Sequence, residues 1–159
     1  MSELQPIAIS ELKSLIGKEV GTSRWFEISQ AKIDAFADVT EDWQFIHVDP
    51  ARTKAETPFD STIAHGFLTV SMLSAMVYDA IPRIEGTAMG VNYGFDKLRF
   101  LSPVHSGSRI RAVFTLIDVD ERKAGELTFK YQVTVEIEGS SRPALAAEWL
   151  SRQYLGVAA

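Results

Sequence analysis

The sequence contains no cysteine, which excludes disulfide bonds, thiolate metal sites and a cysteine nucleophile. It also has no run of about 18 uncharged apolar residues, the length that a membrane-spanning helix needs. The first residues lack the basic segment and apolar run of a secretory signal peptide. From these absences we expect a cytoplasmic protein with no membrane partner.

Basic residues are fewer than acidic ones, since 16 Lys and Arg against 21 Asp and Glu give a net charge of −5. Proteins that bind a phosphate backbone usually carry a basic stripe, so nucleic acid is not an expected partner. Apolar residues, by contrast, make up 46% of the 159 positions. This is enough for the core of one globular domain, and because the sequence has no repeat or linker we expect a single domain over residues 1–159.

The first third of the chain is predicted to hold three helices and one strand. Capping residues and apolar periodicity predict four elements: a helix at 10–16 that ends at Gly17, a strand from 19 to about 28, a helix that Ser29 caps, and a short helix from Asp49 and Pro50 to about residue 56. In the helix after Ser29, the spacing of Ile33, Phe36 and Ala37 predicts one buried side.

The segment 64–80 is apolar on all sides of a helical wheel and is stopped by Pro82. A helix with so little polar surface is predicted to be covered by other elements. After Gly86, alternating apolar and polar residues predict strands at 88–101, 108–119, 126–138 and 144–155, although 144–150 also suits a helix by propensity. One apolar helix followed by four long strands indicates an α+β fold in which an antiparallel sheet curls around the helix.

Asp42 and His47 lie five positions apart in one loop, and His65-Gly66 opens the long helix. A carboxylate and an imidazole from one loop can hold a water between them for proton transfer. The first free N–H groups of a helix can bind developing negative charge. The two motifs therefore predict an acid/base site that faces an oxyanion hole. Because the loop around the pair is apolar at Trp43, Phe45 and Ile46, we also expect Asp42 to be buried, with a pKa above the ordinary value of about 3.9.

Each of these residues also has a plain structural interpretation. Asp42 can cap a turn, His47 can be a satisfied, half-buried histidine, and Gly66 can permit close packing. A metal site would have to draw on histidines and carboxylates: His47, Asp49 and His65, or His105. No pair of these has the i, i+4 spacing of a typical zinc helix, and neither Ser71 nor Ser74 lies in the G-x-S-x-G motif of a serine hydrolase.

The motif Asp42-x4-His47, followed by Ala64-His65-Gly66-Phe67-Leu68-Thr69 with Ser74 beyond, resembles the MaoC-like (R)-specific enoyl-CoA hydratases. The segment 90–100, followed by Pro103-Val104 and Gly107, is similar to the nodulation protein N-like branch of that group. The resemblance covers most of the chain. It implies a hot-dog fold around the helix 64–80, a homodimer, and reversible hydration of the 2,3 double bond of an acyl-CoA or acyl-carrier-protein thioester in fatty acid metabolism, with no metal or redox cofactor.

The resemblance also implies roles at the matching positions. Asp42 and His47 are expected to form the catalytic pair, Gly66 to supply the oxyanion N–H, and Ser74 to support them as a polar group. His65 is expected to orient the loop.

The chain departs from the family pattern in this loop, because Gln44 and Phe45 stand where Asn and Pro are typical. Losing the proline removes a fixed φ angle, and we expect Phe45 to reshape the acyl pocket. Two other functions stay open on the sequence. One is a hot-dog acyl-CoA thioesterase, and the other is a non-catalytic module that binds acyl thioesters.

Overall fold

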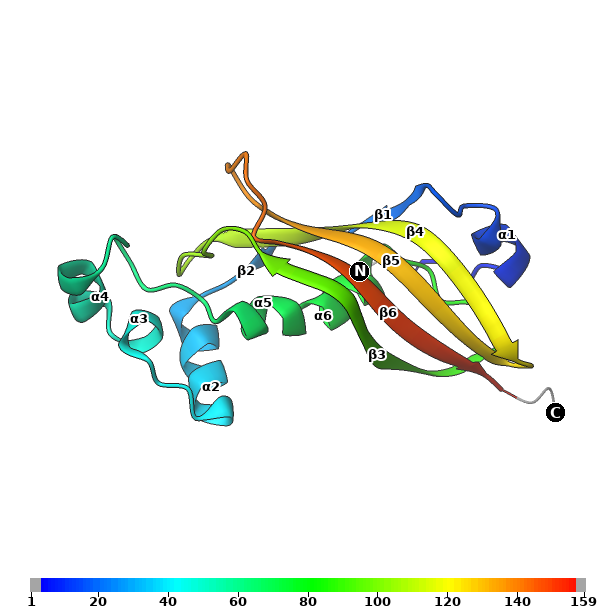
Figure 1. Cartoon of the computed structure of the whole chain (residues 1–159), viewed down its shortest axis with the longest axis horizontal. Coiled ribbons are helices and arrows are strands. Elements are labelled where there is room, and N and C mark those ends of the chain that lie inside the picture. Colours follow the sequence, from blue (N-terminus) through cyan, green and yellow to red (C-terminus); the bar gives the residue numbers. More distant parts are fainter. Residues whose placement is uncertain (1–3, 157–159) are drawn as a thin grey trace.

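A computed structural model describes residues 4–156, which form one six-stranded antiparallel sheet and a set of short helices (Figure 1). The strands are β1 (Glu19–Thr22), β2 (Phe26–Glu27), β3 (Thr87–Phe100), β4 (Arg109–Lys123), β5 (Glu126–Ile137) and β6 (Leu145–Leu155). The helices are α1 (Ile9–Lys13), α2 (Gln30–Thr40), α3 (Phe45–Val48), α4 (Pro50–Glu56), α5 (Gly66–Ser71) and α6 (Leu73–Ala80). The strand order is β1-β4-β5-β6-β3, with β2 also on β4, so β3 lies at one edge of the sheet.

Helices α5 and α6 follow one another along the inner face of the curved sheet (Figure 1). Only Met72 lies between them, and the helical hydrogen bonds continue across it. Met72 N–H bonds to the Leu68 carbonyl at 3.1 Å, and Met76 N–H bonds to the Met72 carbonyl at 3.0 Å. The predicted helix over 64–80 and the antiparallel sheet that curls around it are thus both present. The expectation of an α+β hot-dog fold is confirmed.

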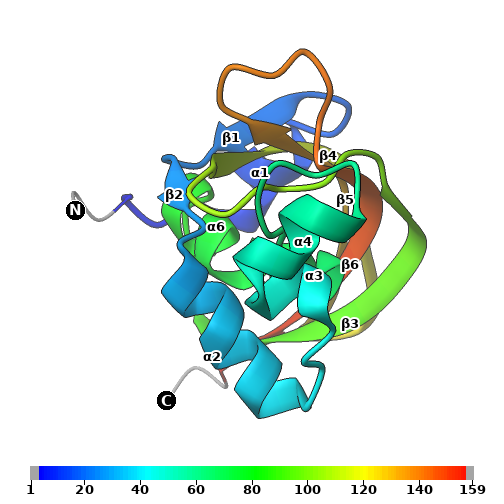
Figure 2. The ribbon, with the colours of Figure 1, turned by 90° about the vertical axis from the view of Figure 1, so that its left-hand side faces the viewer.

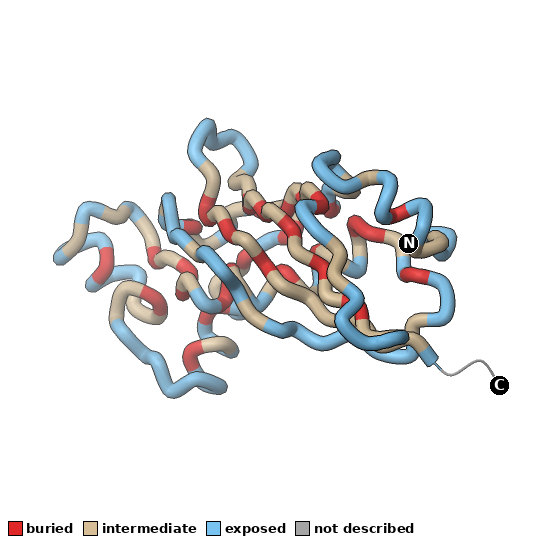
Figure 3. Tube along the Cα trace, turned by 45° about the vertical axis from the view of Figure 1, so that its right-hand side comes forward, coloured by how far each residue is buried: buried red, intermediate tan, exposed pale blue. Residues whose placement is uncertain are grey.

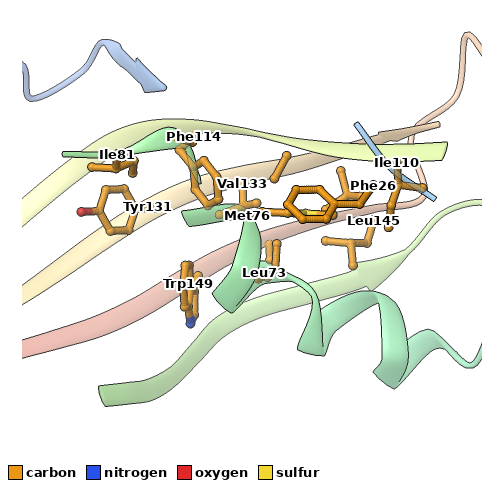
Figure 4. Packing of buried hydrophobic residues seen from close by; sticks show 14 of the residues in the cluster. Phe26, Leu73, Met76, Ile81, Ile110, Phe114, Tyr131, Val133, Leu145 and Trp149 are labelled. Carbon is orange, nitrogen blue, oxygen red and sulfur yellow. The ribbon is translucent and has the colours of Figure 1, made fainter. Parts of the chain in front are cut away.

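The hydrophobic core lies between this helix pair and the sheet (Figures 3 and 4). Leu73 and Met76 on α6 face buried aromatic residues on three neighbouring strands: Phe114, Tyr131 and Trp149. The alternation seen in the sequence sets this arrangement, because every second residue of β5 is buried. The segment 144–150, ambiguous by propensity, is a strand because alternate positions such as Leu145 and Ala147 are buried in the same core.

Two expectations about these elements were wrong. The 64–80 helix is not covered on all sides, since Phe67 is 69% exposed and Tyr78 is 75% exposed. The strand expected at 19–28 is broken into β1 and β2, because the Arg24 backbone N–H donates to the Asp79 carboxylate of α6 in place of a strand partner. The outer side of α5 and α6 is therefore an exposed surface that carries large aromatic side chains.

Helices α2, α3 and α4 gather at one end of the molecule, beyond the start of α5 (Figures 1 and 2). Ser29 caps α2, and Asp49 caps α4 with Pro50 at its first position, as the sequence predicts. Over residues 4–156, no helix combines the length and the apolar character needed to cross a bilayer.

Candidate active site

His47 lies buried in the short helix α3, and a single contact fixes the state of its ring. Its Nδ1 is 2.7 Å from the Ile63 carbonyl oxygen. Because a carbonyl only accepts hydrogen bonds, Nδ1 carries the hydrogen and donates it. In the neutral ring Nε2 then keeps a free lone pair, which is the form that can accept a proton.

Asp42 follows α2 directly. Glu41 ends that helix in the left-handed conformation with φ of 58°, and the Asp42 N–H bonds to the Ala37 carbonyl at 3.2 Å. The expectation that the apolar loop buries Asp42 was wrong, because the Asp42 side chain is 55% exposed. Trp43 does not cover it: the indole is itself exposed and donates its Nε1–H to Asp38 on α2.

His65 connects the two residues. Its ring is buried and stacks on the ring of His47, with centroids 3.7 Å apart and planes 26° apart. His65 Nε2 donates to the backbone carbonyl of Asp42 at 2.9 Å. Nδ1 of His65 has no hydrogen-bond partner among the described residues. The predicted orienting role of His65 thus gains a physical basis, since one ring touches both members of the Asp42–His47 pair.

Ligand atoms of Asp42, His47 and His65 all lie within 4.8 Å of one another. Two acceptors at such a separation can share one water at ordinary hydrogen-bond distances. A metal ion suits the cluster poorly, because lone pairs lie in the imidazole planes and stacked planes do not direct them to one point. Asp49, the third member of the metal set considered from sequence, instead caps α4.

The environment lowers the pKa of His47 from its usual value of 6.5. Burial contributes most, since it disfavours the charged ring, and the facing His65 acts in the same direction. The Ile63 carbonyl and the Asp42 carboxylate oppose this shift without cancelling it. His47 is therefore neutral near pH 7, with its Nε2 available as a base.

A cavity of about 420 Å³ brings His47 and Gly66 together. Most of its other lining is apolar: Ile63, Ala64, Phe67, Phe100, Leu101, Pro103, Val104 and Ala144, with Thr69 and Ser102 as polar members. Phe100 was not singled out from the sequence, because only the fold brings the end of β3 against the start of α5. A Cβ added at Gly66 would lie 2.8 Å from the Phe100 ring.

Two residues that the sequence analysis associated with the site lie elsewhere. Ser74 lines a second cavity of about 430 Å³, and its hydroxyl accepts a hydrogen bond from Asn92 on β3 at 3.2 Å. Phe45 does not line the His47 cavity; its ring lies under the Arg52 guanidinium, 4.1 Å from the ring centroid. Asp42 and His65 do not line this cavity either, but both lie beside His47. The structure thus places His47 and Gly66 in one cavity wall, with Asp42 and His65 next to His47, and leaves Ser74 and Phe45 outside this group.

Comparisons with known proteins agree with the fold and with the motif. A family model described as MaoC like domain matches residues 11–137. Nodulation protein N of Rhizobium meliloti is 51% identical over 148 residues, which cover 93% of this chain and 92% of that protein. A protein named 3-hydroxyacyl-thioester dehydratase Z from Mycobacterium tuberculosis is 41% identical over 145 residues, which cover 91% of this chain and 95% of that protein.

Among solved structures, a monoamine oxidase regulatory protein from Archaeoglobus fulgius has the same fold, with a TM-score of 0.78. The match covers 99% of this chain and 100% of that chain at 21% sequence identity. The sequence and structure comparisons therefore both extend over nearly the whole chain.

Proposed function

Because the chain belongs to the MaoC-like family of hydratases and dehydratases, we propose that it is a hydro-lyase acting on an acyl thioester. In this proposal it adds water reversibly across the 2,3 double bond of a trans-2-enoyl thioester, and in reverse it dehydrates the (R)-3-hydroxyacyl thioester. The (R) configuration rests on the motif's resemblance to (R)-specific hydratases. The thioester carrier is CoA or acyl carrier protein, and no metal or redox cofactor takes part.

Asp42 and His47 act together on the nucleophilic water. The water between them is held by the Asp42 carboxylate, and His47 Nε2 accepts one of its protons as the oxygen attacks C3. The same proton then passes from His47 to C2, so that H and OH are both added and His47 returns to its neutral form. The observation that carries this proposal is the Nδ1 contact to Ile63, since it leaves Nε2 unprotonated in a ring that has a ligand atom within 4.8 Å of one from Asp42.

Gly66 supplies the backbone N–H that stabilises the enolate-like oxygen of the thioester when C3 is attacked. Its position in the wall of the cavity that holds His47 supports this role. The apolar remainder of that wall suits an acyl group.

The deciding experiment follows loss of the conjugated thioester absorbance when purified protein is mixed with straight-chain trans-2-enoyl-CoA substrates of increasing length. We expect turnover that yields the (R)-3-hydroxyacyl product. A free-thiol assay in the same samples separates the alternatives: thiol release identifies a thioesterase, while tight binding with neither signal identifies a non-catalytic binding module. Either of these results would replace the hydratase proposal.

The pH dependence follows from the state of His47. Since its pKa is lowered, the reactive neutral form persists below the usual histidine value, and protonation abolishes it only at more acidic pH. We therefore expect kcat/KM for hydration to be constant near pH 7 and to fall on the acid side with a midpoint below 6.5. Initial rates at subsaturating enoyl-CoA across pH 5 to 8 test this, and a midpoint at or above 6.5 contradicts the assigned role.

A homodimer is the proposed assembly, and its interface includes β3. This strand is 14 residues long, occupies a sheet edge, and exposes large apolar side chains, including Met89 (55%) and Tyr93 (55%). Pairing two β3 edges would satisfy the free backbone groups and cover these side chains. Light scattering that gives a monomer mass at micromolar concentration would contradict it. The cytoplasmic location stays a prediction.

A further inference from the structure

Gln30, the first residue of α2, contacts both segments that hold His47. Its side-chain Nε2 donates to the His47 carbonyl oxygen at 2.8 Å and to Asp34 Oδ1 at 2.7 Å. Its Oε1 accepts a hydrogen bond from the Thr62 hydroxyl. These partners fix the amide orientation, because the carbonyl and the carboxylate only accept while the hydroxyl donates. Both amide hydrogens and the amide oxygen are therefore used.

The segment that Thr62 anchors is the one that orients the His47 ring. Thr62 is buried and is followed by Ile63, whose carbonyl receives the Nδ1–H of His47 at 2.7 Å. Ile63 N–H bonds back to the Ile46 carbonyl at 3.0 Å. The backbone of His47 and the carbonyl that selects its tautomer are thus connected through one side chain, that of Gln30.

We propose that Gln30 is a positioning residue for His47: it fixes the His47 backbone and, through Thr62, the Ile63 carbonyl that holds the ring with Nε2 free. This inference rests on the proposed hydratase function. A displacement of about 1 Å in a catalytic group can cost orders of magnitude in rate, so a residue that never touches the substrate can still control kcat.

The test compares Gln30→Met, which keeps the length of the side chain and removes its hydrogen bonds, with the control Asp34→Ala. The control removes only the outer partner of the Gln30 amide. For hydration of an enoyl-CoA we expect Gln30→Met to lower kcat about 10-fold with KM nearly unchanged, and Asp34→Ala to leave both unchanged. On the Thr62 side, Thr62→Val should lower kcat in the same way, and Thr62→Ser, which restores the hydroxyl, should recover it.

A double variant distinguishes positioning from general damage to the fold. If Gln30 acts through His47, Gln30→Met has no further effect on kcat in a His47→Gln background. The inference would be overturned if Gln30→Met lowered kcat by the same factor in the unsubstituted chain and in His47→Gln, or if it left kcat unchanged.

A second measurement does not depend on activity. Nitrogen NMR of histidine-labelled protein should show His47 as the Nδ1–H tautomer in the unsubstituted chain and as a mixture of tautomers in Gln30→Met. If no enoyl thioester is turned over, the hydratase proposal fails, and the NMR comparison still decides whether Gln30 holds the ring. An unchanged tautomer in Gln30→Met would refute the positioning role even in an active enzyme.

Discussion

Replacing His47 with Gln is expected to lower kcat for enoyl-CoA hydration by roughly 10²- to 10⁴-fold, the range typical for loss of a general base. The variant keeps a polar side chain but has no basic nitrogen at the position of Nε2. Asp42→Asn should cause a loss of the same order, because an amide presents one acceptor where the carboxylate has two. Initial rates at saturating substrate measure both effects, and wild-type-like rates in both variants would remove the pair from the mechanism.

Matched controls separate chemistry from folding. His105 is the third histidine of the chain, and its Nδ1 lies 3.0 Å from the Ser61 hydroxyl, outside the lining of the His47 cavity. We expect His105→Gln to keep nearly full activity. Asp38→Asn, on α2 close to Asp42 in sequence, changes a carboxylate whose one side-chain hydrogen bond among the described residues comes from Trp43, and it should also leave the activity nearly unchanged. Circular dichroism and thermal unfolding should confirm that all four variants fold.

The main features of the fold could be predicted because they follow from local patterns. Alternation over 126–138 predicted β5, and Asp49 with Pro50 predicted the start of α4. The predictions that were wrong concerned features that depend on contacts between distant segments. The break between β1 and β2 comes from a hydrogen bond to Asp79, which is 55 residues away. The exposed side of α5 and α6 could not be foreseen, because composition alone does not say which face the sheet leaves open.

The candidate site was predictable in its residues and less so in its geometry. The spacing of Asp42 and His47 predicted that the two would lie close together, and they do. Gly66 lies in the wall of the cavity that holds His47, while its oxyanion role stays a prediction. The tautomer of His47 depends on a backbone carbonyl, and because every residue has one, the sequence does not indicate which carbonyl accepts the hydrogen bond. The contacts of Gln30 with Thr62 and His47 link three separate segments, so no motif could reveal them.

Gly66→Ala is expected to lower kcat by roughly 10²-fold or more, the scale on which one oxyanion donor contributes. The substitution keeps the N–H but places a methyl group beside it, in the wall of the cavity. The competing explanation is packing, because the added Cβ would lie 2.8 to 3.1 Å from three atoms of the Phe100 ring. Phe100 is 49% exposed and can rotate away, so we expect the melting temperature to change little.

The cycle of Gly66→Ala, Phe100→Ala and the double variant decides between the two explanations. If Gly66 is needed so that the thioester oxygen can approach its N–H, Gly66→Ala lowers kcat by the same factor with and without the Phe100 ring. If the glycine serves only to make room for the ring, removing the ring restores activity and the oxyanion role is lost. Gly156→Ala is the control for adding a methyl group, since the nearest described atoms to its Cβ would lie 3.7 Å away, an ordinary van der Waals distance, and its rate should stay unchanged. We expect kcat to stay low in the double variant, because the added methyl group is attached to the residue that donates the N–H and, unlike the phenyl ring, cannot move aside.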